Sequence, residues 1–255
     1  MNRIFVVLLL IYSSTIRADC TTLLDLTNSP SKIDSACAVP FKKIIIESNY
    51  IYQNLYDSSG TQKNYPNAIL RIGLPSNNEL FVLPPNYIKQ TRFPHRGVSI
   101  TSLGLKHSFS YQENWLFALE EVVDLPSGSY YYGTAAWGEN IKAIITSLIT
   151  KKLTLSTMLG VSHSGDPAGF KGRTFYSFNP IVTLAYNPTE KISLYHELYA
   201  QSKISASEEW GINYDAGALF ELRKNFIIYI SWAHQLQHNL GNFKMYVSGG
   251  FSIML

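Results

Sequence analysis

Apolar and polar residues alternate with a period of two along most of this chain. Between residues 245 and 255, one face carries Val247, Phe251 and Ile253, and the opposite face carries Ser248 and Ser252. Because successive side chains of a β-strand point to opposite faces, this pattern predicts a strand with one apolar face. The same reasoning predicts twelve strands, at 43–54, 66–74, 79–85, 97–110, 114–124, 139–149, 152–163, 173–186, 190–202, 210–222, 225–236 and 243–255.

The predicted connections alternate between long and short. Long connections are expected at 55–65, 84–96, 126–137, 164–171 and 203–209, with short ones at 75–78, 111–113, 150–151, 187–189 and 223–224 and a medium one at 237–242. Barrels of the outer membrane have tight periplasmic turns, longer external loops and an even number of strands. In a soluble β-sandwich or a lipocalin-like barrel, long and short connections would have no reason to alternate. We therefore predict an all-β fold, an antiparallel transmembrane β-barrel of about twelve strands spanning residues 41–255.

The first 18 residues have the layout of a signal peptide. Arg3 precedes an apolar run at 4–12, and small polar residues then lead to Ala18. This run is too short to cross a bilayer as a helix, and no later apolar run approaches the length that would be needed. We expect residues 1–18 to be cleaved and the mature chain to reach the bacterial outer membrane.

Both cysteines, Cys20 and Cys37, follow directly after this leader. In an oxidising periplasm they are expected to form a disulfide, and the further Cys or His residues that a metal site needs are missing nearby. Residues 19–40 are interpreted as a periplasmic N-terminal segment closed by this bond. The sequence leaves open whether the segment stays in the periplasm or inserts into the barrel as a plug.

Composition narrows the range of functions. Of 255 residues, 46% are hydrophobic and 15% are charged, which is too apolar for a disordered tail. Without the leader, the chain carries 19 basic and 18 acidic residues. Nucleic-acid binders need a basic patch, and the sequence contains none, so we expect no nucleic-acid partner. We also expect no cofactor.

Short phrases from residue 70 to the end resemble a bacterial outer-membrane "transporter" family named for the meta-pathway of phenol degradation. The phrases are Leu70–Gly73 with Glu79 and Leu80, Leu103–Lys106, Leu125–Gly128, Leu159–Val161, Tyr195–Tyr199, Asp215–Gly217 and Gly249–Ser252. The resemblance implies a β-barrel channel for small molecules. It therefore favours passive passage of small hydrophobic or aromatic solutes.

Polar side chains opposite the apolar faces are expected to line the barrel interior. The candidates are Glu47, Arg71, Lys106, Lys142, Tyr195, Glu197, Tyr199, Asn213, Asp215 and Glu221. A lysine or arginine facing lipid at the midplane would cost about 2 to 4 kcal/mol, which constrains these positions. Two interpretations remain: an ion-paired filling that closes the barrel, or a narrow passage whose tyrosines contact an aromatic or amphipathic solute. The alternation does not say which of Glu120 and Glu121 faces inward.

Other functions have weaker support. A hydrolase could use His163 and Ser164, but neighbouring residues of a strand point to opposite faces. A closed barrel could act in adhesion through loop tyrosines 130–132, which equally fit an aromatic girdle. His234 and His238 lack the nearby carboxylate that would favour a metal site. We expect neither catalytic nor metal-binding residues.

The C-terminal strand resembles the signal read by the barrel-assembly machinery. Ser248, Gly250, Ile253 and Leu255 carry the resemblance, although such signals usually end in an aromatic residue. The expected partners are therefore outer-membrane lipids, the assembly machinery and a small solute, and the oligomeric state is open.

Overall fold

The computed structural model describes residues 20–255 except 57–59, 113, 168 and 170. The predicted signal peptide lies outside these residues. The strands are β1 (Ile44–Leu55), β2 (Thr61–Leu74), β3 (Asn78–Leu83), β4 (Tyr87–Gln90), β5 (Arg96–Val98), β6 (Ser102–Gln112), β7 (Trp115–Asp124), β8 (Gly138–Thr150), β9 (Leu153–Gly165), β10 (Thr174–Thr189), β11 (Ile192–Gln201), β12 (Gly211–Arg223), β13 (Phe226–Gln237) and β14 (Phe243–Met254). One short helix, α1 (Leu23–Leu26), precedes them.

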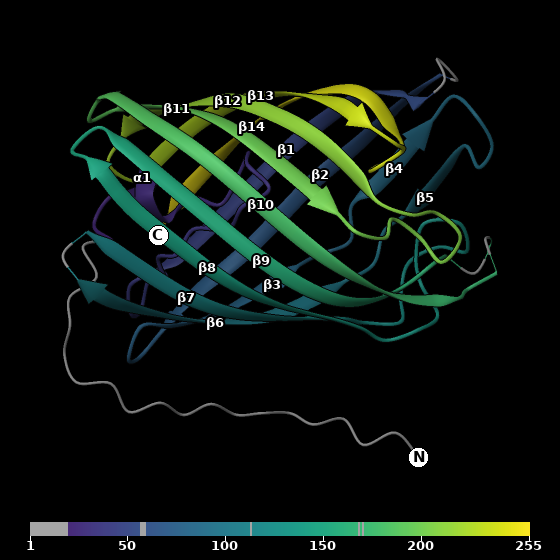
Figure 1. Cartoon of the computed structure of the whole chain (residues 1–255), viewed down its shortest axis with the longest axis horizontal. Coiled ribbons are helices and arrows are strands. Elements are labelled where there is room, and N and C mark those ends of the chain that lie inside the picture. The colour runs from purple at the N-terminus through teal and green to yellow at the C-terminus, as the bar shows by residue number, and fades with distance from the viewer. Residues whose placement is uncertain (1–19, 57–59, 113, 168, 170) are drawn as a thin grey trace.

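Antiparallel pairing closes the sheet into a barrel. Each strand pairs with the next around the ring β1, β2, β3 and β6 to β14, and β14 returns to pair with β1. Within the described residues, twelve strands therefore form the wall, which confirms the predicted barrel. Figure 1 shows the strands running obliquely around the barrel axis.

One predicted strand is divided in the structure. The expected strand at 97–110 becomes β6 in the wall and β5 in a separate hairpin with β4, which pairs with the outer part of β2. Pro84 and Pro85 follow directly after β3. Because proline lacks the N–H that a ladder needs, the chain leaves the wall here and returns to it only at β6.

The two faces of the wall differ as the alternation predicts. Val161, Leu198 and Ile230 are about half exposed on the outside, where lipid would cover them, whereas Glu47 and Asp215 are fully buried inside. No helix among the described residues is long and apolar enough to cross a membrane.

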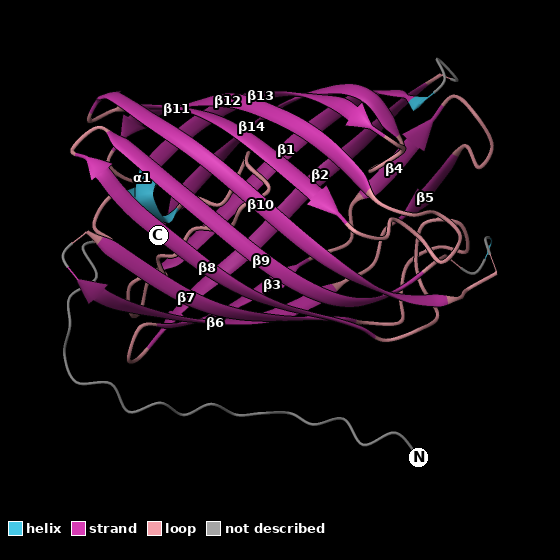
Figure 2. Ribbon diagram, viewed as in Figure 1, coloured by secondary structure: helices cyan, strands magenta, loops and turns pink. Residues whose placement is uncertain are grey.

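The two ends of the barrel carry different connections. Strands join through turns of two or three residues at 75–77, 151–152, 190–191 and 224–225, and this "turn end" also holds α1 and the C-terminus. The "loop end" carries the long connections and the β4–β5 hairpin (Figure 2). In an outer-membrane barrel the turn end faces the periplasm.

Candidate functional site

Residues 20–40, here called the plug, lie inside the turn end of the barrel. The plug starts with α1, whose N-terminus is closed by reciprocal bonds between Thr22 and Asp25. Cys20 and Cys37 form a disulfide with their Cα atoms 5.6 Å apart, so the predicted bond is confirmed. Of the two positions that the sequence left open for this segment, the structure has the inserted one.

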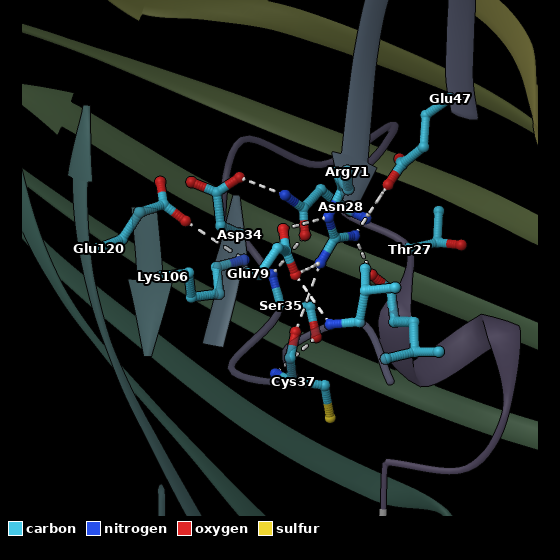
Figure 3. Close-up of polar contacts among 12 residues, drawn as sticks. Thr27, Asn28, Asp34, Ser35, Cys37, Glu47, Arg71, Glu79, Lys106 and Glu120 are labelled. Carbon is cyan, nitrogen blue, oxygen red and sulfur yellow. Dashed lines mark hydrogen bonds and ion pairs between the residues drawn. The ribbon is translucent and has the colours of Figure 1, made fainter. Parts of the chain in front are cut away.

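Arg71 of β2 joins the wall to the plug at the centre of this site (Figure 3). Its guanidinium donates to Glu79 through Nε (2.7 Å) and Nη2 (3.0 Å), and to Glu47 through Nη1 (3.0 Å). It also donates to the plug carbonyl oxygens of Leu26 and Cys37. All three charged side chains are fully buried, and charge-assisted bonds of this kind are among the strongest in proteins.

Three wall carboxylates hold the plug by its backbone. Glu47 accepts from the N–H groups of Asn28 (3.1 Å) and Ser29 (2.7 Å). Glu197 on β11 accepts from the N–H groups of plug residues 32 (2.7 Å) and 33 (3.1 Å). Glu79 accepts from the N–H of Val39 at 2.9 Å. Because buried N–H groups and carboxylates both need partners, each side satisfies the other.

A second ion cluster connects the plug with β6, β7 and β8. Lys142 Nζ lies 2.7 Å from both Asp34 Oδ2 of the plug and Glu120 Oε1, and Lys106 Nζ lies 3.2 Å from Glu120 Oε2. Burial raises the pKa of Asp34, but Lys142 and Lys106 outweigh this effect and hold the pKa well below its ordinary value of 3.8. Asp34 is therefore an anion paired with Lys142 at neutral pH.

The structure shows which of the two adjacent glutamates, Glu120 or Glu121, faces the barrel interior. Glu120 points inward, whereas Glu121 is paired in register with Leu105 and Ile141, whose side chains are exposed on the outer face. Glu120 is 2% exposed.

Apolar contacts also hold the plug against the wall. Leu23, Leu26 and Val39 pack with Ile45 and Ile227 of the wall at the turn end. Where the chain passes from the plug to β1, the backbone at Pro40 lies very close to Gly73 of β2. A Cβ on Gly73 would lie 2.0 Å from the carbonyl oxygen of Pro40. Only glycine leaves room for the chain there.

Next to the plug, the inner side of β11 to β14 carries tyrosines and amides. Asp215 accepts bonds from the hydroxyls of Tyr195 (2.8 Å) and Tyr246. Asn213 donates to the carbonyl of Leu240 at 2.9 Å. Tyr195 and Tyr199 were expected to present their ring faces to a solute, which stays a prediction; the Tyr195 hydroxyl donates to Asp215.

The structure places all ten predicted interior residues on the inner face of the wall. Glu47, Arg71, Lys106, Tyr195, Glu197, Asn213 and Asp215 are buried, and Lys142, Tyr199 and Glu221 are partly buried. Six of the ten meet the plug or its ion cluster, namely Glu47, Arg71, Lys106, Lys142, Glu197 and, by packing, Tyr195. The sequence reasoning did not name Glu79 or Asp34 among the interior residues. The alternation of β3 could have revealed Glu79, whereas the plug has no alternation that could reveal Asp34.

His163 and Ser164, the residues considered for a hydrolase, are neighbours on β9, so their side chains point to opposite faces. The His163 ring lies against the Tyr176 ring, tilted by 32° with the centroids 4.7 Å apart, and the nearby Asp166 carboxylate accepts from the N–H of Ala206. Neither contact directs these groups toward Ser164. Among the described residues, no group of three or more His, Cys, Asp and Glu side chains could hold a metal ion.

The proposed assembly signal lies on and just after β14. Ser248 exchanges a hydrogen bond with Ser231 at 2.8 Å, and Gly250 is paired with Asn49 of β1. Ile253 is paired with Ile46, and Leu255 follows the end of the strand. Recognition of these residues by the assembly machinery stays a prediction.

Comparison with known proteins assigns the family. Residues 27–253 match the family described as "Putative MetA-pathway of phenol degradation", and the chain belongs to that family. No curated protein matches the sequence.

Solved structures of porins share the fold. The chain is similar to the KdgM porin in complex with disordered oligogalacturonate, with a TM-score of 0.55 and 10% identity over 82% of this chain and 98% of that one. It is also similar to the NanC porin, with a TM-score of 0.56 and 8% identity over 83% and 100% of the two chains. The protein thus has the fold of an outer-membrane β-barrel, which it shares with these porins.

Proposed function

We propose that this protein is a channel for small, neutral solutes with an aromatic or otherwise apolar body. Residues 1–18 would direct its export and be removed. The observation that carries the proposal is the charge of the lumen: Arg71, Lys106 and Lys142 are each paired with a carboxylate. The wall also holds the buried carboxyl of Asp215, whose hydrogen-bond donors are the hydroxyls of Tyr195 and Tyr246.

This arrangement disfavours acidic solutes. Among the described residues, the five buried carboxylates of the wall strands, Glu47, Glu79, Glu120, Glu197 and Asp215, outnumber the three inward cations Arg71, Lys106 and Lys142. The KdgM porin was solved in complex with oligogalacturonate. In general, a channel for an acidic oligosaccharide is favoured by cations that are free to contact the solute. Here the three wall cations already hold the plug and its ion cluster, so the wall leaves hydroxyl, amide and aromatic groups for the solute. In the plug, Lys32 Nζ lies over the Tyr246 ring, 5.4 Å from its centroid.

Solute influx into proteoliposomes tests the proposal. Vesicles with trapped β-glucosidase report the influx of p-nitrophenyl glucoside, a neutral aromatic solute, as released nitrophenol. Vesicles with trapped alkaline phosphatase report its anionic counterpart, p-nitrophenyl phosphate. We expect the glucoside to enter about tenfold faster than the phosphate, because a repulsion of about 1.4 kcal/mol between like charges suffices for that ratio.

Two controls make the result interpretable. Protein-free vesicles measure leakage, and heat-dependent gel mobility verifies that the barrel is folded. Equal influx of both solutes would refute the preference for neutral solutes. Influx no faster than in protein-free vesicles would favour a closed barrel that acts through its surface loops.

A further inference from the structure

A cavity of about 250 Å³ lies between the plug and the wall formed by β7 to β12. Its wall side is rich in hydroxyl groups, from Thr146, Thr154, Ser156, Thr183 and Ser193. Leucines of the wall and of α1 supply the apolar part of the lining. The lining contains no lysine or arginine, and its two carboxylates are engaged, Asp34 by Lys142 and Asp25 by the Thr22 hydroxyl. Hydroxyl groups beside apolar surface then suit a small neutral molecule that has an apolar body and one or two polar groups.

The cavity continues toward the periplasmic rim. A second hollow shares Leu24, Asp25 and Asn187 with it and extends to Lys152 and Glu190 in the short turns of the barrel. Since the turn end faces the periplasm, the two hollows together form a path from the cavity to that side.

On its other side the cavity ends at an apolar row across four neighbouring strands. Ala118, Ile144, Met158 and Ile181 are consecutive partners in the registers of β7, β8, β9 and β10. Ile33 and Ala36 of the plug pack on this row. Met158 is farther along β9 toward the loop end than Thr154 and Ser156, so the row separates the cavity from the outer half of the lumen.

This apolar row opposes ions more than neutral solutes. An ion would lose its hydration among apolar side chains, whereas a neutral molecule with an apolar body would lose little. Methionine is unbranched and adapts its shape easily, so Met158 can yield to such a molecule. The buried ion pairs of Arg71 lie on β1, β2 and β3, outside the four strands of the row, and need not break.

We propose that the hydroxyl-lined cavity is a binding site for a small neutral solute, which reaches it across the apolar row while the plug stays attached to β1, β2 and β3. The inference rests on the proposed channel function and adds the site and the route. Ions are excluded at the row, and the solute leaves through the periplasmic hollow.

A single introduced thiol in the full chain tests the site. Both native cysteines are in the disulfide, so Ser156→Cys provides a unique free thiol inside the cavity. Its reaction with a small methanethiosulfonate reagent is followed with and without benzyl alcohol. At about ten times its dissociation constant, the alcohol should slow the reaction about tenfold. Benzoate at the same concentration should leave the rate unchanged. Lys224→Cys, exposed in a turn at the same end, should react at one rate throughout.

The outcomes separate this site from the channel function. Labelled Ser156→Cys should also lose most of its p-nitrophenyl glucoside influx, whereas labelled Lys224→Cys should keep it. The glucoside could enter through the unmodified protein while benzyl alcohol fails to protect the Ser156→Cys thiol and labelling fails to block influx. That result would support the channel function and refute the binding site. Equal protection by benzoate, or a thiol that reacts only after unfolding, would also overturn the site. If no glucoside enters through the unmodified protein, the channel function itself fails.

Discussion

A refolded chain that begins at Pro40 should conduct ions at least about tenfold better than the full chain in a planar bilayer. A barrel of twelve strands is wider than the eight-strand size that wall side chains can fill by themselves. Without the plug, water would fill the space and hydrate Glu47, Arg71 and Glu79, and Ile33 and Ala36 would no longer cover the apolar row. Single-channel conductance measures the difference directly.

A matched deletion controls for the loss of chain. A protein without residues 205–208, which lie in a connection at the loop end, should conduct as the full chain does. Heat-dependent gel mobility should show that all three barrels are folded. The same conductance with and without residues 20–39 would mean that the plug does not close the lumen.

Arg71→Met should destabilise the folded barrel by about 3 to 5 kcal/mol, as expected when one partner of a buried ion pair is removed. The substitution leaves Glu47 and Glu79 as neighbouring buried anions and deprives the carbonyl oxygens of Leu26 and Cys37 of their donor. Reversible unfolding in urea in the presence of lipid vesicles gives the free energy of unfolding.

Two further variants define the cause. Arg71→Lys keeps the charge but cannot form the two parallel bonds to Glu79, so its stability should lie between those of wild type and Arg71→Met. Arg223→Met removes an exposed arginine near a turn and should change the free energy of unfolding by less than about 0.5 kcal/mol. A similarly small change for Arg71→Met would contradict the structural role assigned to Arg71.

The strands could be predicted because the wall separates two different environments. In β13, lipid-facing Ile228, Ile230 and Trp232 alternate with interior Tyr229 and Ser231, and the predicted strand at 225–236 differs from the observed one by a single residue at each end. The same alternation gave the inward orientation of Glu47 and Glu197. The alternation did not predict β4 and β5, which lie outside the ring of the wall.

The partners of the interior residues could not be predicted in the same way. Glu197 accepts from the N–H of Lys32, which is 165 positions away, and this contact depends on the path of the plug. The plug has one turn of helix and otherwise irregular backbone, so it has no period from which its path could be read. For the same reason, the sequence left an ion-paired filling and an open passage as equal interpretations. The plug supplies much of that filling and leaves the cavity beside β7 to β12.

Disulfide trapping in isolated outer membranes tests most directly whether the plug lies inside the barrel. Thr27 Oγ1 and Ser252 Oγ of β14 are 3.2 Å apart, so Thr27→Cys and Ser252→Cys together should bring two thiols within bonding reach. Peptide mass spectrometry should find residues 27 and 252 linked in most of the protein, and Cys20 still linked to Cys37. Thr27→Cys with Tyr50→Cys, on the lipid-facing side of β1, should remain unlinked. Absence of the 27–252 link while the native disulfide forms would place the plug outside the lumen and contradict the account.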